Sequence, residues 1–210
     1  MLTLLMCRRV GSAEGMKDRY IQIMLDLLSL QKQFILTHLK EGDIAVDFTM
    51  GNGHDTAFLS KTVGPAGRVY AFDIQEQALA STAKLLKEQQ CPDNVTLIHA
   101  SHHLLKEHVK EPFRAGMFNL GYLPGGDKRI TTMRETTLPA IEAALDLLDS
   151  DGILNIAVYP GHEEGELEGK MICDYLAGIS RYKVCATLVK ILNSPTSPFF
   201  IMVETKPKKP

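Results

Sequence analysis

The sequence predicts an α/β fold in which a mostly parallel sheet, covered by helices on both faces, ends in an antiparallel hairpin. Short apolar runs alternate with longer amphipathic segments through the middle of the chain, and turns containing glycine or proline separate them. Parallel strands need a crossover connection, usually a helix, so this alternation is typical of a parallel sheet. Two β-rich segments in succession near the end of the chain predict the hairpin.

The first predicted element is one or two amphipathic helices between Tyr20 and Lys40, where apolar residues recur at helical spacing. Gly42 ends this helix, because glycine suits the left-handed C-terminal cap. The apolar run 44–48 is the first buried strand. By the same reasoning, strands are predicted at 68–72, 95–99, 117–120 and 153–158, helices at 55–62, 75–89, 132–148 and 166–178, turns at 64–67 and 149–152, and the hairpin at 183–192 and 199–205.

The length of 210 residues suits one domain better than two. We expect this domain to span residues 16–210, and residues 1–15 to form an N-terminal extension outside the fold. Arg8 and Arg9 follow the short apolar start, whereas a secretory signal carries its basic residues first. No apolar run approaches the roughly 20 residues that span a bilayer, and the four cysteines are scattered. We therefore expect a cytoplasmic protein without a membrane partner; a homodimer stays open.

The formal net charge of -2 argues against a protein whose whole surface binds phosphates. Any contact with nucleic acid must then rest on a local basic patch. The absence of a Cys-x-x-Cys pair disfavours a zinc site, and the adjacent His102 and His103 have no third ligand in view. We therefore expect no bound metal.

A glycine-containing loop follows the first predicted strand. Gly51 and Gly53 let the backbone turn tightly and approach a ligand, but Thr56 stands where a dinucleotide-binding loop has its third glycine. Asp47, four positions before Gly51, matches the arrangement seen in S-adenosylmethionine-dependent methyltransferases, in which the loop faces the methionine moiety. A plain strand-to-helix turn is the alternative interpretation. The predicted cofactor residues of this loop are Asp47, Gly51, Asn52, Gly53 and Asp55.

The next two strand ends supply further candidates for the cofactor. Asp73 lies about twenty residues beyond the glycines, where nucleotide-binding sheets place a carboxylate for the ribose hydroxyls. It could also be the N-cap of the helix that follows. Ile74 and Gln75 lie beside it, and Gln75 could reach the same sugar. Ser101 and His102, after the third strand, are expected to frame the adenine.

The acceptor side of the site is predicted at the fourth and fifth strand ends. Asn119 could accept hydrogen bonds from a substrate amine and aim the amine lone pair at the methyl group; an ordinary turn residue is the alternative. Tyr122 in the following loop and His162 after the fifth strand complete the predicted catalytic set, although His162 could equally be part of a solvated helix start. The general base stays open among His162, Asp127 and water.

Five segments together resemble the YtqB-like rRNA methylase family, from about the first helix to the final hairpin. They are residues 47–56, 72–75, 118–124, 135–137 and 159–162, of which Asn-Leu-Gly-Tyr-Leu-Pro at 119–124 is the most specific. The resemblance implies a Rossmann-like class I methyltransferase with S-adenosylmethionine as cofactor. It also implies methyl transfer to the exocyclic amine of 5-aminomethyl-2-thiouridine at the tRNA wobble position, the MnmM-type reaction, with the anticodon loop as partner. Residues 193–198 are then expected to form one wall of the substrate pocket, although their sequence differs from that of the family's loop.

Three rival functions remain at this point. An rRNA or small-molecule methyltransferase would share every cofactor residue. An NAD-binding enzyme would need a loop that accepts phosphate, which Thr56 disfavours. A cofactor-binding domain without activity would not need the organised loop 119–126. The basic residues available for RNA are Lys128, Arg129, Arg134, Lys206, Lys208 and Lys209.

Overall fold

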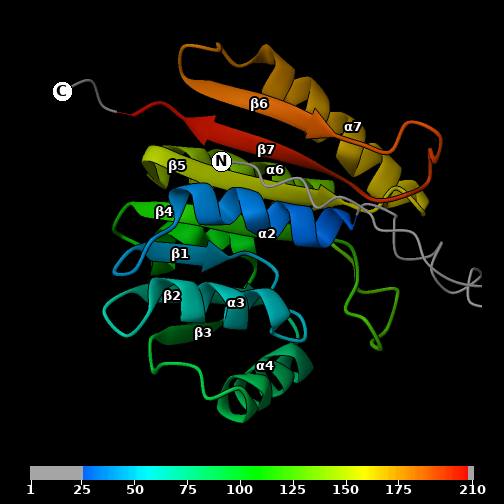
Figure 1. Cartoon of the computed structure of the whole chain (residues 1–210). Helices are drawn as coiled ribbons and strands as arrows, with labels where there is room; N and C mark the ends of the chain where they lie inside the picture. Colours follow the sequence, from blue (N-terminus) through cyan, green and yellow to red (C-terminus); the bar gives the residue numbers. More distant parts are fainter. Residues whose placement is uncertain (1–25, 208–210) are drawn as a thin grey trace, which may run out of the picture.

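The computed structural model describes residues 26–207, so the predicted extension 1–15 and the start of the first helix lie outside the described residues. One seven-stranded sheet has the strand order β3-β2-β1-β4-β5-β7-β6 (Figure 1). Its strands are β1 Ile44–Asp47, β2 Arg68–Asp73, β3 Val95–His99, β4 Phe113–Leu120, β5 Leu148–Val158, β6 Val184–Val189 and β7 Phe199–Thr205. The helices are α2 Leu27–His38, α3 His54–Val63, α4 Glu76–Glu88, the 3-10 turn η3 His102–Leu104, α5 Leu105–His108, α6 Arg134–Leu147 and α7 Glu163–Gly178.

The sheet confirms the predicted class. Strands β1 to β5 pair in parallel, whereas β7 lies antiparallel to both β5 and β6. The strand order reverses between β1 and β4, and α/β sheets bind ligands in the crevice at the carboxyl ends of the strands at such a point.

Helices cover both faces of the sheet (Figure 1). Apolar residues of α2 and α3 pack on one face, together with Ala78 of α4 and Met50, and those of α5, α6 and α7 pack on the other. Phe48 lies just after β1, in the core on the face covered by α5, α6 and α7. Its ring is stacked 3.9 Å from that of Phe118. Phe48 directly follows β1, and Phe118 belongs to β4. The stacked rings therefore hold together the two strand ends that flank the crevice.

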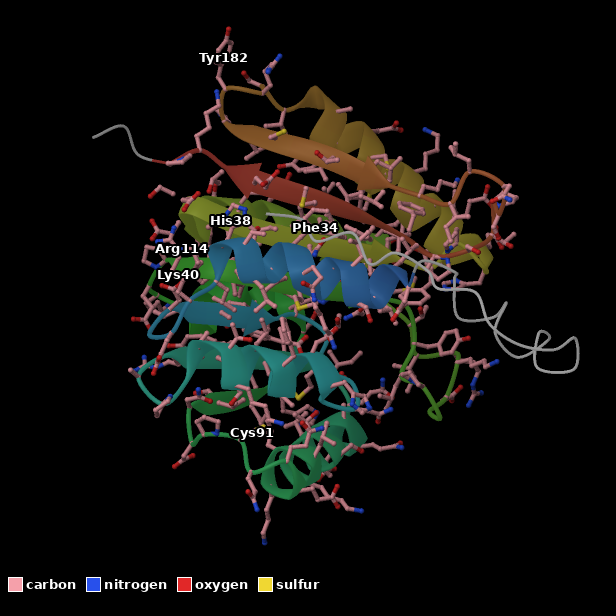
Figure 2. All side chains as sticks on the ribbon, in the orientation of Figure 1. Phe34, His38, Lys40, Cys91, Arg114 and Tyr182 are labelled. Atoms are coloured by element: carbon pink, nitrogen blue, oxygen red, sulfur yellow. The ribbon has the colours of Figure 1, made fainter. Side chains whose placement is uncertain are left out.

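The predicted turn at 149–152 is wrong, because β5 begins at Leu148 and runs through it. The pairing of β5 with β4 shifts register there, and Asp151 has a left-handed backbone with φ 59°. Neighbouring elements supply the hydrogen bonds that a turn would have supplied. The imidazole of His38 lies 2.9 Å from the Asp151 carbonyl, Arg114 donates to the Ser150 carbonyl, and Gly152 N donates to the Thr205 hydroxyl. Figure 2 labels the side chains of His38 and Arg114.

Other boundaries also differ from the sequence expectation, and two short elements were not expected. β4 begins at Phe113 rather than 117, α7 begins at Glu163 rather than 166, and η3 and α5 were not predicted. The last two are too short to display helical periodicity. Within residues 26–207, no helix has both the length and the hydropathy needed to cross a bilayer.

Candidate functional site

A cavity of about 970 Å³ opens at the carboxyl ends of the parallel strands. Its volume is at the upper end of the range for small-molecule sites. It brings together most of the predicted site residues from five separate segments. Those that line it are Gly51, Asp73, Ile74, Gln75, Ser101, His102, Asn119, Tyr122 and His162. Thr196 and Pro198 line it too, as expected of the loop 193–198.

Four predicted cofactor residues do not line the cavity: Asp47, Asn52, Gly53 and Asp55. Asn52 Nδ2 donates to the Pro124 carbonyl at 3.2 Å, which joins the glycine loop to the loop after β4. Gly53 has φ 85°, and a Cβ atom there would come within 2.8 Å of Thr82 Cα in α4. Gly53 is therefore required by the close packing of α4 against the start of α3.

Asp47 at the end of β1 is completely buried. Its carboxyl accepts hydrogen bonds from the Thr56 hydroxyl at 2.6 Å and from Thr49 N at 3.1 Å. Burial raises the pKa of Asp47 to about 7, and the charge of Asp55 acts in the same direction. Asp47 thus anchors the glycine-containing loop through hydrogen bonds in the protein interior.

Asp73 at the end of β2 lines the cavity and also holds two backbone segments. Its oxygens accept from Gly51 N at 3.1 Å and from Gln75 N at 3.0 Å. The N-cap residue of α4 is Gln75, so Asp73 is not the cap that the alternative interpretation proposed. Burial raises the pKa of Asp73, while the two backbone donors act against that rise.

His102 is buried in η3, edge-on to Phe118 with ring centroids 5.7 Å apart. Its Nδ1 lies 3.2 Å from the Phe48 carbonyl, which can only accept, so Nδ1 carries a proton. Burial lowers the pKa of His102 to about 4, and the ring is therefore neutral near pH 7. Beside it, Ser101 Oγ lies 2.8 Å from His103 Nδ1.

Asn119 at the end of β4 is held at both its backbone and its side chain. Its N–H donates to the Thr49 hydroxyl at 2.7 Å, and its Nδ2 donates to Asp55 Oδ2 at 2.7 Å. Thr49 was missed from the sequence, although it belongs to the glycine-loop segment. Asn119 is thereby fixed at the wall of the cavity.

His162 is the N-cap residue of α7, and its Nδ1 accepts from Gly165 N at 3.0 Å. In the neutral ring the proton then lies on Nε2, a buried atom with no hydrogen-bond partner within residues 26–207. Nδ1 is thus not free to accept a proton from a substrate. The ring lies 6.2 Å from that of Tyr122 between centroids, so the two side chains form one wall of the cavity.

The loop between β4 and α6 is fastened to α7 through Glu168. This buried carboxyl accepts from the Thr132 hydroxyl at 2.9 Å and from the Thr137 hydroxyl at 2.5 Å. Burial raises the pKa of Glu168. Glu168 was not predicted from the sequence, since a glutamate in a charge-rich helix gives no sign that it is buried.

The basic patch beyond this loop is smaller than the sequence predicted. Arg129 pairs with Asp127 at 2.6 Å, and Arg134 pairs with Glu164 at 3.0 Å. Lys128 has no ion-pair partner within residues 26–207, and its Nζ lies 5.4 Å from the centroid of the Tyr122 ring. The described part of the chain also holds no group of three or more side chains suited to binding a metal ion.

Comparison with known proteins agrees with this geometry. A family model described as "Putative rRNA methylase" matches residues 69–204. A curated relative, "tRNA (mnm(5)s(2)U34)-methyltransferase, chloroplastic" of Arabidopsis thaliana, is 37% identical over 178 residues, which are 79% of this chain and 64% of the relative. The chain therefore spans less than two thirds of that relative's length.

Two solved structures are similar over almost their whole length. One, described as a putative rRNA-methylase from Clostridium thermocellum, has 38% identity and a TM-score of 0.84, covering 87% of this chain and 98% of that one. The other, a putative methyltransferase from Streptococcus mutans in complex with SAH, has 37% identity and a TM-score of 0.79, covering 87% and 99%. With its class I methyltransferase fold and these matches, the chain belongs to the rRNA methylase family.

Proposed function

We propose that the protein is an S-adenosylmethionine-dependent methyltransferase that N-methylates the 5-aminomethyl group of the wobble uridine in tRNA. The observation that carries the proposal is that Asp73 and Asn119 line one and the same cavity. Such a cavity can hold a nucleoside cofactor and an acceptor amine next to each other. Family membership, the complex of the S. mutans structure with SAH and the name of the A. thaliana relative support it.

The residues present fit the cofactor. Asp73 offers a carboxylate to the ribose hydroxyls, with Gln75 beside it, and the neutral His102 and Ser101 frame the base. Gly51 has φ 50° and brings backbone close to the methionine end. When bound, S-adenosylmethionine supplies an electrophilic methyl group on its sulfonium.

On the acceptor side the chain orients an amine and excludes water. Asn119 Oδ1 accepts a hydrogen bond from the amine, while Tyr122 and Tyr159 wall the cavity around it. The amine reacts as the neutral base, and the methylated amine gives up its extra proton to bulk solvent when the product leaves the cavity. His162 Nδ1 and Asp127 are not assigned as the base, since each is already engaged with another group.

The substrate base enters from a single-stranded loop. Bases in such loops can be splayed out and stacked on aromatic side chains. Tyr122 offers the ring and Lys128 offers the cation at the mouth of the cavity. A contact of this size predicts modest RNA affinity that falls with added salt.

The test is nucleoside mass spectrometry on tRNA from a strain that lacks the protein. The unmethylated aminomethyl nucleoside should accumulate, and purified protein with S-adenosylmethionine should convert it in vitro. Parallel assays with rRNA and with small metabolites use radiolabelled methyl groups, because the family's description favours rRNA as the second candidate. Methyl transfer to rRNA alone, or an unchanged tRNA profile in a strain without a redundant enzyme, would refute the tRNA assignment.

A further inference from the structure

Two short contacts connect α2 to the acceptor side of the site. Lys32 Nζ in α2 lies 2.8 Å from Asp55 Oδ1, and Asn119 Nδ2 lies 2.7 Å from Asp55 Oδ2. Asp55 stands in the first turn of α3 and Asn119 at the end of β4. The Asp55 side chain is 16% exposed and that of Lys32 31%. Each oxygen of the carboxylate thus has its own partner, in a half-buried position.

The contact with Asp55 decides which end of the Asn119 amide faces the cavity. An ionised carboxylate can only accept hydrogen bonds, so the NH2 group of Asn119 must face Asp55. The carbonyl Oδ1 is then left for the cavity. An amine whose N–H donates to Oδ1 keeps its lone pair free for the methyl group. With the amide reversed, its N–H would donate to that lone pair and block attack.

Lys32 keeps this orientation in place. Burial raises the pKa of both Asp47 and Tyr159, and Asp55 lies close enough for its charge to act in the same direction. A second carboxylate in this setting is held by the opposite charge of Lys32, whose Nζ also lies 5.3 Å from the centroid of the Phe58 ring. Both contacts of Lys32 come from α3, so α2 and α3 together define the position of the carboxylate.

We propose that Asp55, held by Lys32, is a positioning residue that turns the carbonyl oxygen of Asn119 toward the acceptor amine. This inference rests on the proposed methyl transfer. It replaces the sequence prediction of Asp55 as a cofactor contact with a task on the acceptor side.

The kinetic test compares substitutions along this connection. Asp55→Asn retains the shape but offers either end to Asn119, and should lower kcat by roughly 10- to 100-fold, in line with the strength of a charge-assisted hydrogen bond. The KM for S-adenosylmethionine should stay within about twofold. Lys32→Met should lower kcat less, and Lys32→Arg should restore it. Lys170→Met removes a different ion pair, with Asp174 on α7, and should have no effect.

A second readout does not depend on the substrate. In ¹⁵N-labelled protein, the side-chain amide signals of Asn119, assigned by their loss in Asn119→Ala, should shift and exchange faster in Asp55→Asn. Unchanged amide signals, an unchanged kcat, or a rise in the KM for S-adenosylmethionine that accounts for the whole loss would each overturn the inference. A wild-type protein without activity on tRNA would instead refute the proposed function, and the amide signals would then decide the orientation of Asn119 by themselves.

Discussion

At the scale of single residues, Thr56 explains why the loop after β1 lacks the third glycine of a dinucleotide site. Its hydroxyl donates to the buried Asp47 carboxyl, so the position serves the interior instead of a pyrophosphate. The same pairing makes Asp47 a support of the loop, although the sequence pattern had suggested a direct cofactor contact. An acidic residue at the end of a strand can thus support the loop beside a cavity without lining that cavity.

Asp47 predicts a pH dependence of stability. Its folded-state pKa of about 7 lies above its ordinary value of 3.8, so the folded protein binds this proton more tightly than the unfolded chain. The stabilisation from this group is present below about pH 4 and is lost as the pH rises through about 7. Urea denaturation from pH 4 to pH 8 should show the stability of wild type falling relative to Asp47→Asn. A constant difference across that range would contradict the prediction.

Asp73 predicts the strength of cofactor binding. Asp73→Ala should weaken binding of S-adenosylmethionine about 10- to 100-fold, because hydrogen bonds between hydroxyls and a carboxylate are each worth about 1.5–3 kcal/mol. Isothermal titration calorimetry measures the affinity, and a thermal melt verifies that the variant is folded. Unchanged affinity in the folded variant would remove Asp73 from the site.

For Asn119 we expect a loss of turnover in place of a loss of cofactor affinity. Asn119→Ala should depress turnover far more than cofactor affinity, since its interaction with the amine matters most in the transition state. Steady-state kinetics with tRNA and calorimetry with S-adenosylmethionine separate the two quantities. Turnover near that of wild type would mean that the strand end is merely structural.

At the scale of elements, the site depends on how closely α3 and α4 meet. α3 begins after Gly53, whose backbone is left-handed, and Thr82 of α4 occupies the space that a side chain would need. The loop after β4 is similarly fixed by Glu168 of α7. The cavity walls are therefore set by contacts between separate helices and loops, not by neighbouring residues in the sequence.

Gly53→Ala should destabilise the protein by about 2–4 kcal/mol, through a left-handed backbone of about 1 kcal/mol and a clash with α4. Gly125→Ala is the matched control, since Gly125 has φ 83° but open space around it. Its substitution should cost only the backbone strain. Chemical denaturation of both variants measures the difference; equal losses would show that the contact with Thr82 has no weight.

At the scale of the whole molecule, the formal net charge of -2 is low for a protein proposed to bind RNA. Near the cavity, ion pairs with Asp127 and Glu164 already occupy Arg129 and Arg134, so these two side chains have less charge to offer a phosphate. Lys128 is therefore the basic residue of the predicted patch with the most to offer a phosphate. Recognition should rest mainly on the cavity and only in small part on attraction to the RNA backbone.

Lys128→Gln should weaken tRNA binding by about two- to fivefold at low salt and reduce the salt dependence, while affinity for S-adenosylmethionine stays the same. Arg68→Gln is the control, because Arg68 begins β2 and so lies at the amino ends of the strands, whereas the cavity lies at their carboxyl ends. Filter binding at several salt concentrations measures both variants. Equal weakening by the two substitutions would indicate a general charge effect and would count against a local role for Lys128.

Much of the fold could be predicted from local patterns. Hydrophobic patterns located every strand of the sheet and the hairpin, and the signal is clearest in β1, β4, β5 and β7, where burial on both faces leaves a continuous apolar run. It failed at 149–152, where local residues favour a turn but α2, β4 and β7 supply the hydrogen bonds of a strand. It also missed η3 and α5, since one turn of helix has no period to detect.

The sequence by itself determined the class of the molecule and the strand ends that carry polar side chains. Carboxyl ends of parallel strands lie at one edge, so the order of strands and helices along the chain was enough to group Asp73, Asn119 and His162. Only the tertiary structure decided what each one does. Whether a carboxylate lines a cavity, as Asp73 does, or supports residues beside it without lining it, as Asp47 and Asp55 do, depends on partners such as Lys32 that lie far away in the chain. Local sequence contains no record of those distances.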